Sequence, residues 1–169
     1  TMGTKAWELY ADDPAVIAIK MTLYRTNEES PIVDALIRAA EKGKQVVCLI
    51  ELKARFDEER NIFGAQAMEK AGVHVVYGIV GLKTHAKLAL VVRKDRENFR
   101  SFVHIGTGNY HSITARIYTV LSLFTADPAL GRYAGRLFNF VTGYAKPAEL
   151  EKLAISTLAM KKRLVVLID

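Results

Sequence analysis

The sequence predicts an α/β domain in which a mixed β-sheet is flanked by helices. Apolar strand-like runs alternate with amphipathic helical patterns through residues 15–77, which is typical of parallel strands joined by right-handed crossovers. Residues 87–105 carry two apolar runs joined by a charged stretch, which indicates a hairpin-like connection and antiparallel strands. The 169 residues are enough for one domain with its own core.

The first half of the chain is expected to hold three strands and two helices, in the order strand, helix, strand, helix, strand. Short apolar runs predict buried strands over residues 15–21, 46–52 and 73–77. Ser30 and Pro31 supply a helix cap and a first helical residue, and Gly43 marks the end of that helix. Residues 57–59 place negative charge where a helix N-terminus favours it, and Gly72 ends this second helix.

The second half is expected to add further strands and two helices. Apolar runs predict strands over residues 87–92, 101–105 and 118–125, and a short strand over residues 153–155. Asp127 and Pro128 start a helix that extends to about Thr142. Residues 157–168 have the pattern of a basic amphipathic helix.

The domain organisation follows from these patterns. Residues 1–14 are polar and weakly patterned, so we interpret them as an N-terminal lead-in that includes a cloning junction, followed by one domain over residues 15–169. The single cysteine, Cys48, lies inside an apolar run and is expected to fill core space. One cysteine forms no disulfide within the chain, which agrees with a location in the cytoplasm, with or without contact to a membrane.

The charge balance predicts an anionic partner. Lys and Arg number 24 against 18 Asp and Glu, which gives a formal net charge of +6. Nucleic acid, a membrane surface, a nucleotide and polyphosphate all fit such a surplus, and charge alone does not choose among them.

The sharpest local feature is the string Gly81-Leu82-Lys83-Thr84-His85-Ala86-Lys87-Leu88. Because alternate residues of a strand share a face, His85 and Lys87 are expected to project to the same side. A neutral imidazole can attack a phosphorus centre while a neighbouring ammonium offsets the phosphate charge and lowers the histidine pKa. The pair is weak evidence when taken alone, since a histidine and a lysine also meet at strand ends by chance.

A second feature, Gly106-Thr107-Gly108-Asn109-Tyr110, comes directly after a predicted strand. Two glycines let the backbone approach a ligand closely, and successive amides in such a turn can cradle phosphate oxygens. Asn109 is suited to hydrogen-bond and orient a histidine. An ordinary glycine-rich turn explains the string about equally well.

Two arginines follow the first two predicted strands. Arg25 follows the first strand and Arg55 the second. Because ligands of parallel α/β sheets bind at the carboxyl ends of the strands, both guanidinium groups are expected near one anion site. Each arginine taken singly is also compatible with an ordinary solvated surface position.

The combination of His-x-Lys on one strand and Gly-x-Gly-Asn further along resembles one half of a phospholipase D-like site. The resemblance implies a phospholipase D-like fold in which two halves meet, with one histidine as the nucleophile and the other as the general acid. This chain carries one half. The other half is expected either in an absent part of a longer chain or in a second copy across a two-fold axis.

Five strings spread over almost the whole chain resemble successive signatures of the polyphosphate kinase family. They are Thr22-Leu23-Tyr24-Arg25, Glu51-Leu52-Lys53-Ala54-Arg55-Phe56-Asp57-Glu58-Glu59, Gly81-Leu82-Lys83-Thr84-His85-Ala86-Lys87, His104-Ile105-Gly106-Thr107-Gly108-Asn109-Tyr110 and Thr114-Ala115-Arg116-Ile117-Tyr118-Thr119. The resemblance is to the first of the family's two C-terminal catalytic domains, which implies a fragment of a longer multidomain enzyme.

The resemblance implies a reversible transfer of the ATP γ-phosphate to inorganic polyphosphate, with His85 as the phosphorylated residue. Arg25 and Arg55 match positions that the family associates with magnesium and phosphate. Because a guanidinium cannot ligate a cation, we expect them to hold phosphate oxygens of a magnesium nucleotide. Tyr118 matches a position that contacts ATP, whereas Lys87 and Asn109 are catalytic candidates from the phospholipase D-like pattern.

The same resemblance implies a set of partners, and the sequence differs from the family pattern at two positions. Expected partners are ATP and ADP, polyphosphate, the remaining domains of the enzyme and further copies of the chain, with Mg²⁺ accompanying ATP and no specific nucleic acid. Val120 stands where the family usually has an aspartate, and His111 stands where asparagine is common. The isolated chain is expected to be inactive, because the second catalytic domain and much of the nucleotide pocket are absent.

Two other functions stay open at this point. The first is a phospholipase D-like phosphodiesterase or nuclease that acts as a homodimer. The second is a non-catalytic module that binds polyanions. His74 and His104 lie in apolar strands, so they are expected to serve the core or to support the site rather than to act as nucleophiles.

Overall fold

The computed structural model describes residues 2–24, 30–51, 58–78, 83–110, 117–143, 153–156 and 160–168. Its elements are α1 Met2–Asp12, β1 Val16–Leu23, α2 Pro31–Glu41, β2 Gln45–Ile50, α3 Glu58–Lys70, β3 His74–Tyr77, β4 Lys87–Asp95, β5 Asn98–Gly106, β6 Ser122–Thr125, α5 Pro128–Val141 and α6 Lys161–Ile168. In the described residues the strands form one six-stranded sheet in the order β3-β2-β1-β4-β5-β6.

The sheet is mixed, as the sequence predicted. Strand β1 pairs in parallel with β2, and β2 pairs in parallel with β3. Strand β4 is antiparallel to β1 and to β5, and β5 is antiparallel to β6. The carboxyl ends of β1, β2, β3 and β5 therefore lie at the same edge of the sheet as the amino ends of β4 and β6. We call this edge the site edge.

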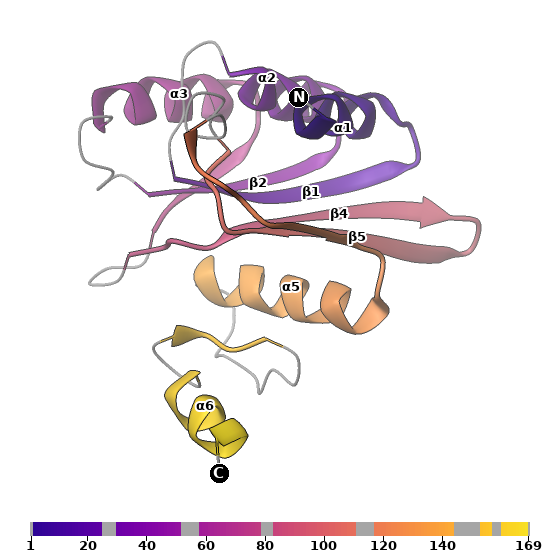
Figure 1. Cartoon of the computed structure of the whole chain (residues 1–169). Coiled ribbons are helices and arrows are strands. Elements are labelled where there is room, and N and C mark those ends of the chain that lie inside the picture. Colours follow the sequence, from indigo (N-terminus) through magenta and orange to yellow (C-terminus); the bar gives the residue numbers. More distant parts are fainter. Residues whose placement is uncertain are drawn as a thin grey trace.

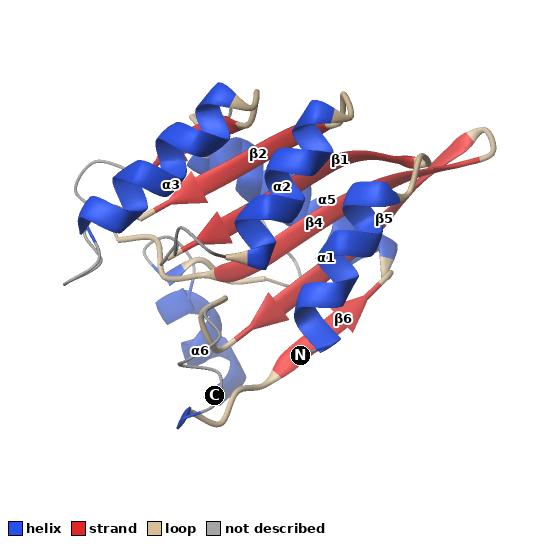
Figure 2. Ribbon diagram, turned by 90° about the horizontal axis from the view of Figure 1, so that it is seen from above, coloured by secondary structure: helices blue, strands red, loops and turns tan. Residues whose placement is uncertain are grey.

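Helices cover both faces of the sheet. Helices α1, α2 and α3 lie side by side on one face, and α5 lies on the other (Figures 1 and 2). A large apolar cluster fills the space between the first face and its three helices. A smaller cluster joins β4, β5 and α5, and it contains Leu88, Leu90, Val103, Ala134 and Phe138. This two-sided burial explains why the central strands have long apolar runs.

Most predicted helix boundaries are confirmed. Pro31 begins α2, although in the described structure the hydroxyl of the N-cap residue Ser30 makes no capping hydrogen bond. The backbone has a positive φ at Gly43 and Gly72, just after α2 and α3, which glycine adopts at little cost. Asp127 caps α5, because its carboxylate accepts hydrogen bonds from the backbone amides of two residues in the first turn, at 2.7 and 3.0 Å.

The expectation of a weakly patterned segment over residues 1–14 is wrong for its secondary structure. Residues 2–12 form α1, and Trp7 and Ala11 on this helix are buried in the larger apolar cluster. The two residues are four positions apart and so share one helical face. Most other positions of the segment are polar, which obscures this short apolar face in the sequence. How the chain divides into domains stays a prediction.

Three further boundaries differ from the expectation. Strands β4 and β5 extend through most of the charged stretch and meet at a tight turn, where Arg96 has a φ of 56°. Strand β6 begins at Ser122, later than predicted. Residues 153–155 form no strand in the described structure, where they line a cavity instead of pairing with the sheet.

The predicted last helix is confirmed in the part that can be compared. Helix α6 spans Lys161–Ile168, and residues 157–159 of the predicted helix lie outside the described residues. None of the helices in the described ranges has the length and apolar character that a membrane crossing requires.

Candidate functional site

The His-x-Lys string lies at the site edge, where β4 begins. His85 precedes the first residue of β4 and is exposed, whereas Lys87 is the first residue of the strand and is buried. The rings of His85 and Tyr24 are nearly perpendicular, and their centroids are 5.3 Å apart. The Lys87 ammonium lies 5.5 Å from the centroid of the same Tyr24 ring. Both groups therefore lie beside one tyrosine at the end of β1.

The Lys87 ammonium holds the backbone of the histidine. Its Nζ donates a hydrogen bond to the carbonyl oxygen of His85 at 2.6 Å. A cation–π contact with Tyr24 adds to the stabilisation of this buried charge. Burial lowers the pKa of Lys87 below its ordinary value. The side chain thus places positive charge near the imidazole.

The electrostatics of the site favour a neutral imidazole. His85 is exposed as a residue, but neighbouring groups partly desolvate its ring. This partial desolvation lowers the pKa of His85, and the positive charge of Lys87 lowers it further. The sequence predicted the second cause, and the structure adds the first as the larger one. A neutral ring keeps a lone pair on nitrogen, which a nucleophile requires.

A cavity of about 300 Å³ opens beside these two residues. One wall is the beginning of β4 and the end of β5, with Gly106 and Thr107, and another is formed by Leu137 of α5 and residues 153–155. The cavity brings the two strings singled out in the sequence, His-x-Lys and Gly-x-Gly-Asn, to one place. It joins an imidazole, an ammonium and a glycine-rich turn in a single concave site.

The glycine-rich turn over residues 106–109 is packed tightly against the chain that leads into β6. Thr107 donates its backbone amide to the carbonyl of Leu121 at 3.0 Å, and its side-chain oxygen accepts the Leu121 amide at 3.0 Å. A Cβ atom built on Gly108 would lie 2.1 Å from Cγ1 of Val120. Glycine at position 108 is therefore required for close approach, and Val120 occupies the space beside it.

Asn109 faces inward with an unused acceptor. Its Oδ1 atom is buried and has no hydrogen-bond partner among the described residues. This oxygen therefore makes no bond to a histidine among the described residues, and the orienting role of Asn109 stays a prediction. A buried unpaired amide oxygen costs about 1–3 kcal/mol, so it is a group for which a donor is expected when the site is filled.

The turn is closed at its base by a pair that the sequence did not single out. The Nδ1 atom of His104 and the hydroxyl of Tyr110 are 2.6 Å apart and share a hydrogen bond that joins the residues flanking the turn. Trp7 packs edge-on against Tyr110, and Phe124 lies against His104 with ring centroids 4.3 Å apart. His104 is thus a supporting residue, as the sequence analysis expected for a histidine in an apolar strand.

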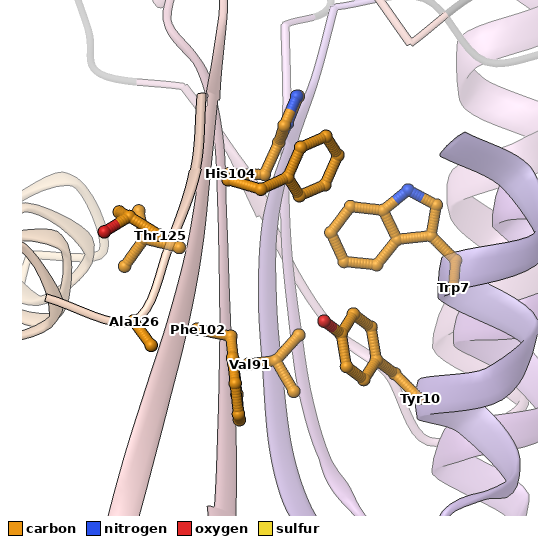
Figure 3. Close-up of a pocket in the computed structure, with 9 residues that line it drawn as sticks. Trp7, Tyr10, Val91, Phe102, His104, Thr125 and Ala126 are labelled. Carbon is orange, nitrogen blue, oxygen red and sulfur yellow. The ribbon is translucent and has the colours of Figure 1, made fainter. Parts of the chain in front are cut away.

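A second cavity, of about 200 Å³, lies behind this pair and is lined by Trp7, Tyr10, Val91, Phe102, Val103, His104, Phe124, Thr125 and Ala126. In Figure 3, Trp7 and Tyr10 reach from α1 toward the strands that carry the other lining residues. Most of these groups are apolar, and His85 is not among them. The first cavity therefore remains the candidate site.

The remaining predicted residues fall in two groups. Arg25 and Arg55 lie outside the described residues, and so does His111. Tyr118 is described and lies just before β6, with 68% of its surface exposed. Its contact with ATP stays a prediction. His74 is exposed at the start of β3, which is the opposite edge of the sheet.

The metal-ligating side chains of the described residues are scattered. Nowhere in the described ranges do three or more His, Cys, Asp and Glu side chains gather into a group able to hold a metal ion. Cys48 is buried and unpaired, and burial raises the pKa of its thiol, so it is unsuited to metal binding or catalysis. The Mg²⁺ expected to accompany ATP therefore stays a prediction.

Comparisons with known proteins connect this site with one family. Residues 4–147 match the sequence model of the polyphosphate kinase C-terminal domain 1. The chain is 58% identical over 159 residues to a polyphosphate kinase of Erythrobacter litoralis, covering 94% of this chain and 22% of that protein. A polyphosphate kinase of Synechocystis is 57% identical over 159 residues, with the same coverage. The chain thus spans about a fifth of the length of these relatives.

Solved structures agree with the sequence comparisons. The polyphosphate kinase of Porphyromonas gingivalis superimposes with a TM-score of 0.86 at 36% identity, covering 98% of this chain and 28% of that one. Nuc, a phospholipase D family member from Salmonella typhimurium, gives a TM-score of 0.63 at 16% identity, covering 86% of this chain and 90% of that one. The second likeness concerns the fold alone, and it confirms the predicted phospholipase D-like arrangement.

Proposed function

The chain belongs to the polyphosphate kinase family, and on that premise we propose that it transfers the γ-phosphate of ATP to inorganic polyphosphate through a phosphohistidine at His85. The observation that supports this most is the setting of the imidazole. His85 is exposed at the mouth of a cavity, and both the partial desolvation of its ring and the neighbouring ammonium lower its pKa. Phosphoryl transfer depends mainly on such positioning and charge.

The proposed reaction has two steps. In the first, a ring nitrogen of His85 attacks the γ-phosphorus of ATP, a nitrogen–phosphorus bond forms, and the bond to the bridging oxygen breaks with release of ADP. In the second, a terminal oxygen of polyphosphate attacks the phosphohistidine, the nitrogen–phosphorus bond breaks, and the chain grows by one phosphate. Both steps are reversible, so polyphosphate and ADP can regenerate ATP. The reason is that phosphohistidine and polyphosphate are both high-energy phosphate donors.

Residues around His85 take defined roles in this proposal. Lys87 offsets charge on the transferred phosphoryl group, and the free Oδ1 of Asn109 accepts a hydrogen bond when the site is filled. Arg25 and Arg55 hold phosphate oxygens, and Tyr118 contacts the nucleotide. Mg²⁺ enters as part of the ATP substrate, with no step assigned to a metal held by the described residues.

The rest of the machinery lies outside this chain. Because the chain spans about a fifth of its relatives, we propose that the remaining domains complete the nucleotide pocket and supply the second half of the site. Further copies of the enzyme are proposed to associate with it. The 169 residues alone are therefore expected to sustain no continuous polymer synthesis.

Chain growth by the full-length protein tests the proposed function. With ATP, Mg²⁺ and a polyphosphate primer, the polymer should lengthen while ADP accumulates, and added ADP should reverse the reaction. Cleavage of DNA or lipid diesters without ATP would instead favour a diesterase. Salt-sensitive polyphosphate binding without turnover would favour a polyanion-binding module.

The pH dependence of the first step is predicted to depend on Lys87. Replacing Lys87 by methionine removes the charge that lowers the pKa of His85, although the contribution of burial remains. The pKa of His85 therefore rises, and the imidazole becomes protonated at a higher pH. The rate of phosphorylation by ATP should begin to fall at a higher pH than in the wild type, and its maximum should drop by about 10²-fold.

Lys83→Met is the matched control for this pH profile, because Lys83 is an exposed lysine of the same segment. Lys83→Met should not change the pH at which the rate of phosphorylation begins to fall on the acid side. If Lys87→Met leaves the acid side unmoved, or moves it to lower pH, Lys87 does not act on His85 through its charge.

A further inference from the structure

The backbone around His85 is held by two buried polar side chains from neighbouring strands. The Thr22 hydroxyl, on β1, donates to the carbonyl of Ala86 at 2.7 Å and accepts the amide of Leu88 at 3.0 Å. The Glu51 carboxylate, just after β2, accepts the amide of Thr84 through Oε2 at 2.9 Å. The residues immediately before and after His85 are thus both tied to side chains.

The hydroxyl of Thr22 links β1 to β4 just beyond the point where backbone pairing between these strands ends. Backbone pairing between β1 and β4 is present from Val16 to Met21 on β1, with Met21 opposite Ala89 on β4. Thr22 is the next residue, and its side chain bonds to Leu88 and Ala86. The carbonyl of Leu88 is also 3.3 Å from the hydroxyl, a longer distance than the 2.7 Å to Ala86.

Glu51 is an unusual residue to bury at this point. It is 4% exposed, and Thr22 is 5% exposed. Removing a carboxylate from water costs several kcal/mol unless hydrogen bonds or opposite charges compensate it. A carboxylate retained at the end of a central strand, with an oxygen directed at the amide next to His85, indicates a role in placing that segment.

We propose that Thr22 and Glu51 are positioning residues that fix the backbone on both sides of His85 so that its imidazole is aligned for in-line attack. The proposal rests on the function proposed above and names residues that touch the backbone of the nucleophile rather than the substrate. Misplacement of a reacting group by about 1 Å costs on the order of 10²-fold in rate, so anchors of this kind affect turnover more than nucleotide binding.

Thr22→Val tests the first anchor, with Thr22→Ser as its matched control. Valine keeps the shape of threonine but removes the hydroxyl, whereas serine keeps the hydroxyl. In the full-length protein with γ-labelled ATP, Thr22→Val should lower the maximal rate of His85 phosphorylation by about 10-fold or more, with little change in the ATP concentration for half-maximal rate. Thr22→Ser should stay within about three-fold of the wild type.

Glu51→Gln and Glu51→Leu test the second anchor, and this test does not depend on Thr22→Val. Thermal unfolding establishes whether each variant is folded. Glutamine retains an acceptor for the Thr84 amide and should keep most of the maximal rate, whereas leucine removes the acceptor and should lose about 10-fold or more. Equal rates for Glu51→Leu and wild type would overturn the assignment of Glu51.

The two proposals fail in different ways. If the wild type labels His85 and Thr22→Val labels it equally fast, the positioning role is wrong while the proposed function stands. An effect of Thr22→Val confined to the ATP concentration for half-maximal rate would also overturn it, because that indicates contact with the nucleotide. If the wild type itself takes up no phosphate at His85, the proposed function fails.

Discussion

Replacing His85 by glutamine is expected to lower polyphosphate synthesis by the full-length protein by about 10⁴-fold or more, since the reaction loses its nucleophile. Glutamine is polar and of similar length, but its amide nitrogen has no lone pair suited to attack phosphorus. His85 is exposed, so its replacement should change the unfolding temperature little. The measurement is steady-state polymer growth from ATP, together with thermal unfolding of both proteins.

His74→Gln is the control for this result, because His74 is also an exposed histidine but lies at the opposite edge of the sheet. Its polymer growth should equal that of the wild type. A His85→Gln enzyme that keeps more than about a tenth of the wild-type rate would show that the covalent step takes place elsewhere, because loss of a true nucleophile has a far larger effect.

Replacing Gly108 by alanine is the second prediction with a large effect. The new methyl carbon would lie 2.1 Å from Cγ1 of Val120 and 3.0 Å from its Cβ, which is closer than van der Waals contact permits. The β-branched side chain of Val120 has little freedom to move aside, and the neighbouring Leu121 is hydrogen-bonded to Thr107 of the same turn. The clash should therefore shift the turn and the segment before β6 apart.

The expected result is a loss of about 1–3 kcal/mol in the free energy of unfolding and about 10²-fold in the rate of His85 phosphorylation. Chemical denaturation and labelling by ATP measure the two quantities. Adding Val120→Ala to Gly108→Ala removes Cγ1, the atom in closest contact. The double variant should recover most of the lost stability and most of the lost phosphorylation rate. If the double variant is as impaired as Gly108→Ala, the effect does not arise from packing against Val120.

The sequence predicted the fold well where local patterns determine structure. The alternating apolar runs, the Ser30-Pro31 and Asp127-Pro128 starts and the glycines after α2 and α3 placed most elements correctly. Helix α1 was missed because its buried face consists of few residues, Trp7 and Ala11 among them. Residues 153–155 were predicted to form a strand because they are apolar, but they pack beside α5 and the site instead.

The candidate site was only partly predictable for a related reason. His85 and Lys87 form a compact string, and a chemical argument from neighbouring residues was sufficient to select them. Thr22 and Glu51 reach the same segment across 66 and 33 residues of chain, so their role depends on strand order, which a local pattern does not contain. The bond between His104 and Tyr110 connects residues only six positions apart, but it depends on how the chain turns back after β5 and brings a half-buried tyrosine against a buried histidine.

The position of Val120 gives the family resemblance a physical meaning. The family resemblance leads us to expect an aspartate there, whereas in this chain a valine packs against Gly108. No carboxylate at position 120 is then available to bond with the imidazole or with a cation. In this proposal the His85 nucleophile therefore depends more on two other features. These are the charge of Lys87, which keeps the imidazole neutral, and the hydrogen bonds from Thr22 and Glu51, which fix the backbone beside it.

The decisive measurement locates the phosphate on the protein. The full-length enzyme is mixed briefly with γ-labelled ATP and Mg²⁺, stopped under alkaline conditions that preserve phosphohistidine, digested and sequenced by mass spectrometry. We expect an acid-labile phosphate on the peptide that contains His85, and this phosphate should disappear when ADP is added. Phosphate on a different residue, or a modified protein whose label survives acid, would contradict it.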